Sequence, residues 1–321
     1  MKKLSFKGNL LLLSSITLVL SIGLATPQAF AAEGDVIAQY FCAGSGVGVA
    51  FDGTDVWWVD SSDTFNLKRC NAVTGVAGTP LAVVGMADPL STISYDGTRN
   101  LFWAATMNLG GNMRDIYQIA PDGTATYIFT SNFPAIGTFT DGLAYDGEDD
   151  SLWLSGDVDD EIYHYATDGT LIAGPILIPK DPNNSCGNSG IAAGTGILYL
   201  GFNGCNIIQK HNKADLSLIS SFVLNGAMRV EDLECDNITF AGQGIDVIWS
   251  KDFGDTDLIA FEVPQGTCPT GGGGIPVGGS IIPIDASALL IAGAFTNAIW
   301  IAPVLVGAAG TTAFYLKTRK N

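Results

Sequence analysis

The sequence predicts an all-β fold, a five-bladed β-propeller, followed by a single C-terminal transmembrane helix. Three observations predict the propeller: an internal repeat that occurs five times, an aromatic residue in one strand of each copy, and no helical i, i+3, i+4, i+7 pattern between the two apolar ends of the chain. The composition agrees, because 47% hydrophobic residues can fill a sizeable core and 40 glycines favour many tight turns.

Each copy of the repeat begins with a short strand that ends in a turn, as in the segment Gly142–Gly147. The turn falls at equivalent positions 52, 96, 146, 194 and 236, which are 44, 50, 48 and 42 residues apart. This period fits one four-stranded propeller blade. The fourth copy, Gly190–Gly194, is degenerate and lacks the aspartate that the other copies place in the turn.

A second strand with an aromatic residue near its centre follows each turn. The aromatic residues are Trp57, Trp103, Trp153, Tyr199 and Trp249. Their recurrence at one position favours packing between blades over a carbohydrate-binding platform. A third strand then opens with a polar residue, in turn Asn66, Asp115, Glu161, Asn206 and Asp257, and in two copies an Asp-Gly turn starts a fourth strand.

The fifth copy has no fourth strand of its own, because it stops near Glu262-Val263-Pro264. The segment Gly34–Ala38 parallels Asp168–Ala173, which begins the fourth strand of the third copy. We therefore expect the N-terminal strand to close the ring as the outer strand of the last blade. Two alternative folds are less favoured. A six-bladed ring would need a sixth copy that the sequence does not show, and an open β-solenoid would not require the N-terminal strand to join the last copy.

The two ends of the chain predict export and membrane attachment. Residues 1–32 have the basic start, apolar stretch and small-residue site of a signal peptide, with a retained N-terminal anchor as the alternative. The propeller ectodomain is assigned to residues 33–268, and a Gly/Pro-rich tether to residues 269–288. Residues 289–315 carry no charge over 27 positions and predict a transmembrane helix, and the basic tail 316–321 is placed in the cytoplasm.

The tail also carries an ordered pattern: Val277-Gly278-Gly279, Ile282–Asp285, Ala288–Ala294 and Trp300. Over about 45 residues, this pattern resembles a C-terminal anchor found on many archaeal cell-surface proteins. The resemblance implies attachment to the cell membrane by a single pass and says nothing of the activity outside.

Charge and cysteine content are consistent with export. Residues 33–280 hold nine basic and 31 acidic residues, a net charge of −22. This charge argues against binding to nucleic acid and favours cations or basic partners. The alternative is that the charge serves only solubility.

Six cysteines without a C-x-x-C pair favour disulfides. Of the 15 possible pairings we favour pairs within a blade, Cys186 with Cys205 and Cys235 with Cys268, which leaves Cys42 with Cys70 in a poorer geometry. Asn183 and Asn237 begin glycosylation sequons.

The repeats over residues 34–265 resemble NHL, SMP-30-like and streptogramin-lyase-like propellers. The Asp-Gly turn, the tryptophan strand and the Asp/Glu-Ile-Tyr strand carry this resemblance, which implies a fold and transfers no function.

The loops that enter the innermost strands predict the candidate site, at the mouth of the central channel. Alignment of the copies places Val47, Ser91, Asp141, Ser189 and Glu231 there, with Asn188 and Asp232 beside them. Asp141, Glu231, Asp232 and Asn188 could supply oxygen ligands to Ca²⁺. SMP-30-like lactonases use a similar set, and Thr140–Leu143 resembles part of their motif. The alternative is a polar, hydrated mouth without a metal.

Two functions from different classes follow from these observations. The favoured one is a non-catalytic recognition or envelope module, displayed at the cell surface, that binds an extracellular protein or a glycan. The alternative is a Ca²⁺-dependent lactone hydrolase or lyase that uses the carboxylates at the channel mouth. Neither His164 nor His211 lies near a motif serine or cysteine in the sequence, so hydrolase triads have little support.

Overall fold

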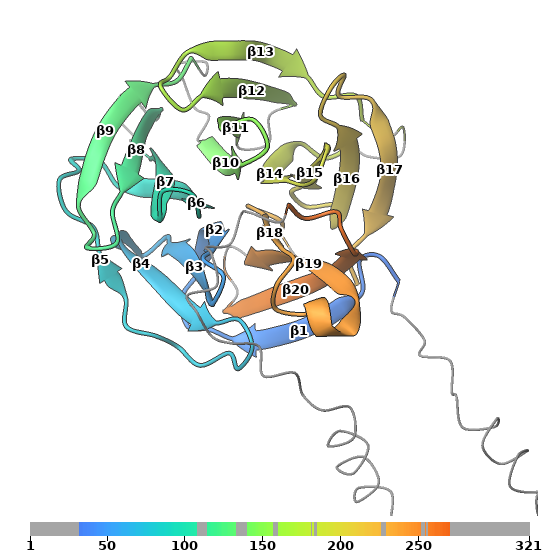
Figure 1. Cartoon of the computed structure of the whole chain (residues 1–321), viewed down its shortest axis with the longest axis horizontal. Coiled ribbons are helices and arrows are strands. Elements are labelled where there is room, and N and C mark those ends of the chain that lie inside the picture. Colours follow the sequence, from blue (N-terminus) through green and yellow to red (C-terminus); the bar gives the residue numbers. More distant parts are fainter. Residues whose placement is uncertain are drawn as a thin grey trace, which may run out of the picture. The chain divides into compact units, whose positions relative to one another are not determined.

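The computed structural model confirms a five-bladed propeller, with five sheets arranged around one axis (Figure 1). It describes residues 32–269, except for 108–113, 133–139, 157–159, 181, 183–184, 226–228, 252–253 and 255. Almost all of the predicted signal segment and of the tether, and the whole predicted transmembrane helix 289–315, lie outside the described residues. Within the described part of the chain, no helix has the length and apolar character needed to cross a membrane.

Each blade is a four-stranded antiparallel sheet, and in blades 1 to 4 the strands follow one another in chain order from the axis outward. Blade 1 holds β2 (Gly46–Phe51), β3 (Asp55–Asp60), β4 (Asp63–Asn71) and β5 (Leu81–Ala82). Blade 2 holds β6 (Leu90–Asp96), β7 (Leu101–Thr106), β8 (Asp115–Ile119) and β9 (Ala125–Thr130). Blade 3 holds β10 (Thr140–Asp146), β11 (Ser151–Gly156), β12 (Glu161–Ala166) and β13 (Leu171–Leu177). Blade 4 holds β14 (Asn188–Ala193), β15 (Ile197–Phe202), β16 (Ile207–Asn212) and β17 (Leu218–Val223).

Blade 5 confirms the predicted closure. It holds β18 (Glu234–Asp236), β19 (Ile245–Lys251), β20 (Asp257–Pro264) and, as its outer strand, β1 (Val36–Phe41). The register runs from Val36 opposite Phe261 to Phe41 opposite Asp257. A short 3-10 helix, η1 (Ala241–Gln243), joins β18 to β19. The ring is thus completed by pairing the two ends of the propeller sequence.

The predicted packing role of the aromatic strand is also confirmed. The buried apolar residues form five clusters, and each cluster combines residues of two neighbouring blades. The repeat aromatics Trp57, Trp103, Trp153, Tyr199 and Trp249 are distributed one to each cluster and are buried. The propeller therefore has its hydrophobic core between blades, repeated around the ring.

The turn aspartate and the aromatic residue of the repeat form a pair in four blades. The indole Nε1 donates to the turn carboxylate in Trp57–Asp52 (2.7 Å), Trp103–Asp96 (3.3 Å), Trp153–Asp146 (3.2 Å) and Trp249–Asp236 (2.9 Å). The other carboxylate oxygen accepts backbone N–H groups of the same turn, as Asp52 Oδ1 does from Thr54 and Asp55. One carboxylate thus satisfies both the buried indole and the turn.

Blade 4 departs from this pattern for a structural reason. Its turn holds Gly194 and its aromatic residue is Tyr199, so both partners of the pair are replaced together. The backbone after β20 occupies the space, because Thr195 N donates to Thr267 O at 2.7 Å. A Cβ atom on Gly194 would lie 2.6 Å from that same carbonyl oxygen.

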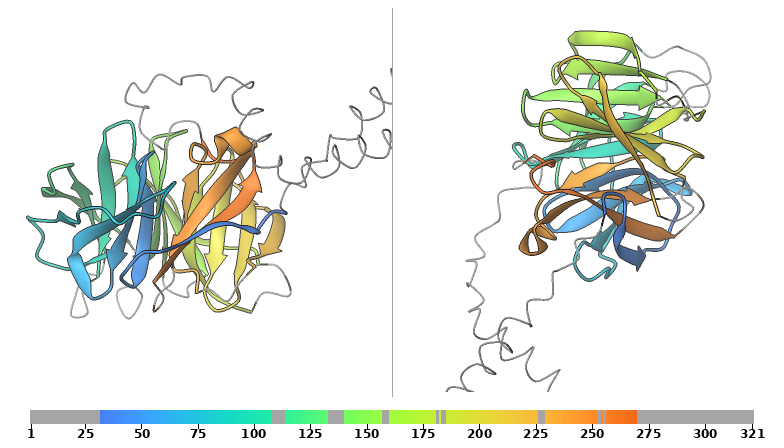
Figure 2. Two further views of the ribbon diagram at one scale, coloured as in Figure 1. Left: turned by 90° about the horizontal axis from the view of Figure 1, so that it is seen from below. Right: turned by 90° about the vertical axis from the view of Figure 1, so that its right-hand side faces the viewer.

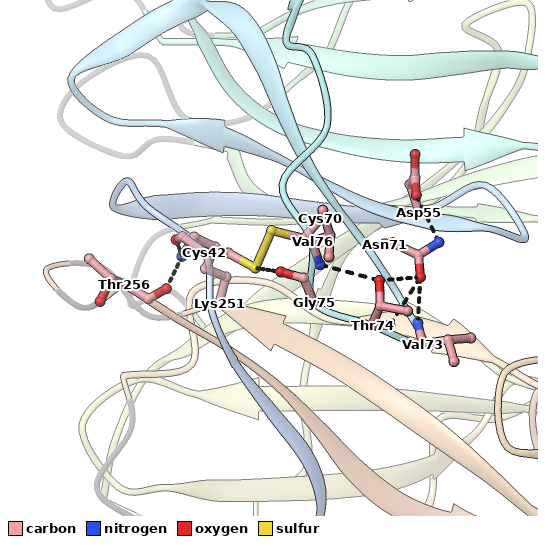
Figure 3. The surroundings of a disulfide bond; sticks show 10 residues. All are labelled: Cys42, Asp55, Cys70, Asn71, Val73, Thr74, Gly75, Val76, Lys251 and Thr256. Carbon is pink, nitrogen blue, oxygen red and sulfur yellow. Dashed lines mark hydrogen bonds between the residues drawn. A yellow bond between two sulfur atoms is a disulfide. The ribbon is translucent and has the colours of Figure 1, made fainter.

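Three disulfides form, and they join the favoured pairs: Cys186–Cys205, Cys235–Cys268 and Cys42–Cys70. The third pair, expected only as the remaining one, joins two blades instead of lying within one. Cys42 follows β1 of blade 5, whereas Cys70 lies in β4 of blade 1, so the bond spans the boundary between the two blades (Figure 3). Beside it, the buried Lys251 donates from Nζ to Cys42 O (2.8 Å) and Thr256 O (2.9 Å).

The two faces of the ring have different chemistry. We call the face at which the innermost strands begin the mouth face, and the face at which they end the turn face; Figure 2 shows the ring from the side. Because successive strands of a blade are antiparallel, β20 ends and β1 begins at the turn face. Both ends of the described chain therefore leave the propeller on the turn face.

Candidate functional site

The predicted mouth positions coincide with irregularities in the innermost strands. The register between the first two strands of a blade shifts at Gly46/Gly48, Leu90/Thr92, Thr140/Gly142 and Asn188/Ile191. The residues inside these bulges include Val47, Ser91, Asp141 and Ser189, four of the five positions assigned from the repeat. All five mouth residues, Glu231 among them, are at most 9% exposed. Bulges often re-aim side chains next to functional sites, but here the side chains are buried.

One residue further along each strand, the blades meet at the axis. The equivalent residues are Gly48, Thr92, Gly142, Gly190 and Asp232. A Cβ on Gly48 would lie 2.4 Å from Thr92 Cα, and one on Gly190 would lie 2.9 Å from Asp232 Cα. The innermost strands thus approach so closely that glycine is required at these two positions.

Asp232 fills the axis between the blades. Its Oδ2 accepts from Val49 N of blade 1 (3.4 Å) and from Thr92 Oγ1 of blade 2. Its Oδ1 accepts from Ile191 N of blade 4 (3.4 Å) and from Leu233 N (2.9 Å). Burial raises the pKa of the Asp232 carboxyl well above its usual value. This side chain therefore serves as an internal tie among four blades.

A second carboxyl, Glu234, lies on the same strand face two residues on. Its Oε2 accepts from Ser94 Oγ (3.2 Å) and its Oε1 from Cys235 N (3.2 Å). Ser94 Oγ in turn accepts from Tyr145 N of blade 3 (2.9 Å). Burial raises the pKa of Glu234 to about 8. Asp232 contacts blades 1, 2 and 4, and Glu234 is linked through Ser94 of blade 2 to blade 3. Together with blade 5, to which both acids belong, all five blades are connected.

Sequence reasoning assigned Asp232 to a metal site and did not single out Glu234. The signal was present in the repeat alignment. Where blade 5 has Asp232, the other copies have glycine or threonine, and where it has Glu234, they have alanine or serine. When one copy of a repeat has an acidic residue where the other copies have a small one, its longer side chain is expected to fill the space at the propeller axis.

Of the other predicted Ca²⁺ ligands, Glu231 is engaged by protein groups through both oxygens, whereas the buried Asn188 Oδ1 accepts no hydrogen bond from the described residues. Glu231 Oε1 pairs with Arg229 Nη2 at 3.1 Å, and both its oxygens accept from Asn203 Nδ2 at 3.2 Å. Asn188 Nδ2 donates to Gly190 O (3.0 Å) and Gly201 O (2.9 Å). Asp141 is 8% exposed. Among the described residues, no three or more His, Cys, Asp or Glu side chains gather as metal ligands. Calcium binding stays a prediction.

The sequons stay predictions as well. Asn183 lies outside the described residues. Asn237 directly follows β18 and is half-buried in the turn, next to Asp236.

The structure brings together a serine, a histidine and an aspartate that the sequence keeps apart. His164 Nε2 lies 2.6 Å from Ser151 Oγ and 3.5 Å from Asp149 Oδ2. However, Ser151 is fully buried and its hydroxyl donates to Asp149. The imidazole stacks on Trp153, with ring centroids 3.7 Å apart, and burial lowers the pKa of His164. Because the Ser151 hydroxyl is closed to solvent, these residues form a buried polar contact beside Trp153.

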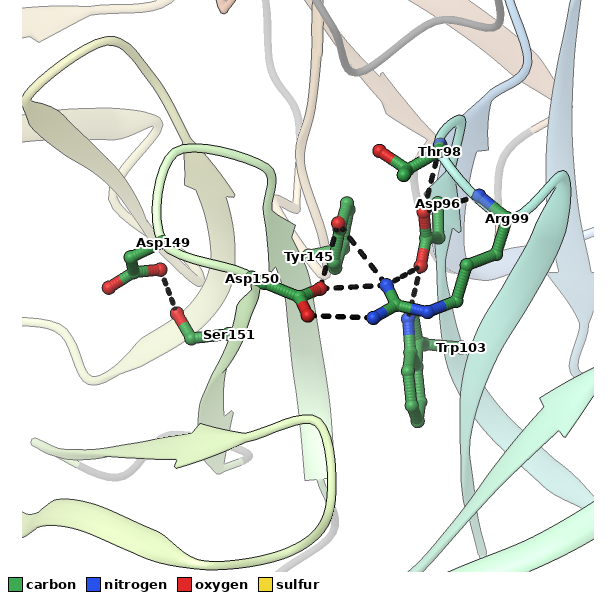
Figure 4. A network of polar contacts seen from close by, with 8 residues as sticks. All are labelled: Asp96, Thr98, Arg99, Trp103, Tyr145, Asp149, Asp150 and Ser151. Atoms are coloured by element: carbon green, nitrogen blue, oxygen red, sulfur yellow. Dashed lines mark hydrogen bonds and ion pairs between the residues drawn. The ribbon is translucent and has the colours of Figure 1, made fainter.

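An ion-pair network links blades 2 and 3 on the turn face (Figure 4). Arg99 contacts Asp150 through Nη1 and Nη2, both at 2.7 Å, and contacts Asp96 at 2.6 Å. Tyr145 Oη donates to Asp150 at 3.0 Å. The Arg99 guanidinium holds the pKa of Asp150 below its usual value. Every charge in the network has a partner, which makes it a structural link between blades.

Comparison with known proteins supports the fold and no narrower statement. The sequence matches no family model and no curated protein. Glutaminyl cyclase from Myxococcus xanthus is similar in structure, with a TM-score of 0.51 and 12% identity over 72% of this chain and 100% of that chain. A protein of unknown function from Bacteroides thetaiotaomicron has a TM-score of 0.48 and 12% identity, over 69% of this chain and 60% of that chain. At such identities the likeness shows the fold alone.

Proposed function

We propose that this protein is a cell-surface propeller, anchored by one C-terminal helix, that recognises an extracellular partner without catalysing a reaction. The condition of the channel mouth carries the non-catalytic interpretation. Its five positions are buried, and the Asp232 and Glu231 carboxylates already accept hydrogen bonds from protein donors. A catalytic metal would need several oxygen ligands free to converge on one point.

The anchoring rests on sequence patterns and agrees with the course of the chain. The apolar segment 289–315 and the basic tail favour a single pass, and the tail pattern resembles archaeal surface anchors. Since β20 ends at the turn face, the tether would start there. The net charge of −22 favours a basic or uncharged partner over an anionic one.

Cell fractionation tests the location. The full chain should sediment with membranes and be digested by protease added to intact cells, whereas a chain ending at residue 288 should be released into the medium. A full chain recovered in the soluble fraction, or protected from external protease, would refute the surface assignment.

Calorimetric calcium titration of the detergent-solubilised full chain tests the non-catalytic interpretation. The expected result is no saturable binding. One-site binding that is lost in Asp141→Ala/Glu231→Ala, but kept in the exposed-turn variant Asp215→Ala, would favour the metal-dependent hydrolase or lyase instead.

A further inference from the structure

A pocket of 330 Å³ lies on the turn face, between blades 1 and 2, away from the channel mouth. It is built from the turns that follow β2, β6 and β8, together with β4 and the start of β5. Its volume lies at the lower end of the range typical of small-molecule sites. We propose that this pocket binds a neutral carbohydrate, a function that depends neither on the membrane anchor nor on a metal at the axis.

The floor of the pocket is aromatic and rigid. Trp57, Tyr95 and Phe102 line it and are at least nine-tenths buried. The ring of Phe102 lies 5.2 Å from that of Trp57 and 5.2 Å from that of Tyr95, measured between centroids. Pro80 and Pro121 complete the apolar lining. The packed rings fix the shape of the floor before a ligand arrives, and the exposed Pro80 and Pro121 offer C–H surface for the apolar side of a sugar.

Arg69 supplies a fixed donor. Its guanidinium lies over Trp57, 4.7 Å from the ring centroid. Nε donates to Thr79 O and Nη1 to Asp55 Oδ2, both at 3.1 Å. Nη2 makes no hydrogen bond to the described residues, so a held guanidinium keeps a donor for a ligand. Because the group is already oriented, little side-chain entropy is lost on binding.

Asn100 and Asp52 add a second donor and an acceptor. Asn100 Oδ1 accepts from Tyr95 Oη at 2.7 Å, which orients the amide and leaves Nδ2 without a bond to the described residues. Asp52 Oδ2 accepts from Trp57 Nε1 at 2.7 Å and keeps further acceptor capacity. The pocket thus presents both donors and acceptors, the combination that vicinal hydroxyl groups require.

The charges around the pocket disfavour an anion, because Asp52 lines it, Asp55 is paired with Arg69 beside it, and the surface is strongly acidic. A cation over Trp57 would meet the guanidinium of Arg69, which already lies over that ring. A neutral ligand that carries hydroxyl groups and an apolar face avoids both repulsions and still uses the donors and acceptors of the pocket.

The test is titration of the detergent-solubilised full chain with neutral sugars, namely glucose, galactose, mannose and N-acetylglucosamine, followed by tryptophan fluorescence. We expect saturable one-site binding of at least one of them. Arg69→Met keeps the apolar stem over Trp57 and removes the donors, and should weaken binding tenfold or more. Asn100→Gly should do the same without backbone strain, because Asn100 has φ of 54°.

Asn206→Gly is the matched control, since Asn206 has φ of 53° in a turn of blade 4. It should bind sugar like the parent, and thermal denaturation of each variant checks that it is folded. Failure of all four sugars to saturate the protein would overturn the proposal. Binding that survives both Arg69→Met and Asn100→Gly in folded protein would overturn it as well.

Discussion

At the scale of single residues, two buried acidic side chains connect the innermost strands at the axis of the propeller, where buried charge is normally unfavourable. Asp232 and Glu234 replace the small residues that the other blades place at the axis, and they accept hydrogen bonds from the strands around them. A buried carboxyl is costly unless it is hydrogen-bonded. The surrounding donors meet that requirement, so the acids hold the innermost strands together.

Replacement of Asp232 by alanine should destabilise the protein by roughly 3 kcal/mol or more, because the donors of blades 1, 2 and 4 would lose a buried acceptor. Urea unfolding measures the change. Asp122→Ala is the control, since Asp122 is exposed and only caps its own turn. Equal midpoints for the two variants would contradict the proposed tie.

Glu234 predicts a pH dependence of stability. Its pKa is about 8 in the folded protein, against an ordinary value near 4.5. Between these two pH values Glu234 is protonated in the folded protein and ionised in the unfolded chain. Its stabilising contribution to the free energy of unfolding is therefore complete below about pH 4.5 and is lost as the pH rises toward 8. Glu234→Gln should remove that loss and be more stable, relative to the parent, at pH 9 than at pH 5. Thermal unfolding at both pH values measures the difference, and an unchanged difference between them would refute the assignment.

At the scale of elements, the repeated turn shows how one blade adapts to its neighbour. In four blades a carboxylate joins the turn to the indole of the next strand. In blade 4 the segment after β20 takes the place of that carboxylate against Gly194. The degenerate copy therefore reflects a contact made with the C-terminal end of the propeller.

Gly194→Ala should destabilise the protein by about 1–3 kcal/mol, because the added Cβ would lie 2.6 Å from Thr267 O. Gly147→Ala is the matched control in the turn of blade 3, where the nearest atom to the added Cβ lies at 3.7 Å. Denaturant midpoints compare the two. If both variants match the parent, the contact with Thr267 does not restrict this turn.

The repeat made the blades, their aromatic packing and the closing strand predictable, because strand period, turn residues and repeat length are local signals. The axis was only partly predictable. Asp232 was assigned to the right place but to a metal, since the sequence does not show that donors of three other blades converge on it. The contact between His164 and Ser151 was missed because it forms across a register that the sequence does not reveal.

At the scale of the whole molecule, the ring is closed by hydrogen bonds between β1 and β20, and a disulfide secures the neighbouring boundary. Cys42–Cys70 fixes the segment after β1 to blade 1. Lys251 of blade 5 donates to Cys42 O, just after β1 of the same blade, and its Nζ lies over Trp58 of blade 1, 4.8 Å from the ring centroid. The closing strand is therefore held from both sides.

The double variant Cys42→Ala/Cys70→Ala should lower the free energy of unfolding by roughly 3 kcal/mol, as expected for a cross-link with a sequence separation of 28 residues. Chemical denaturation under oxidising conditions measures this loss. A variant as stable as the oxidised parent would contradict the role of this bond.

The closing strand also sets the order in which the protein can be completed during synthesis. The ribosome makes β1 before every other strand of the propeller, yet its partner β20 is made after all of the others. Throughout elongation β1 has an unpaired edge, and the last ring-closing contact is among the most distant in the sequence, a kind that forms slowly. A chain released before β20 has been made would keep the edge of β1 unpaired. The ring can therefore close only after translation has passed the last strand of the propeller.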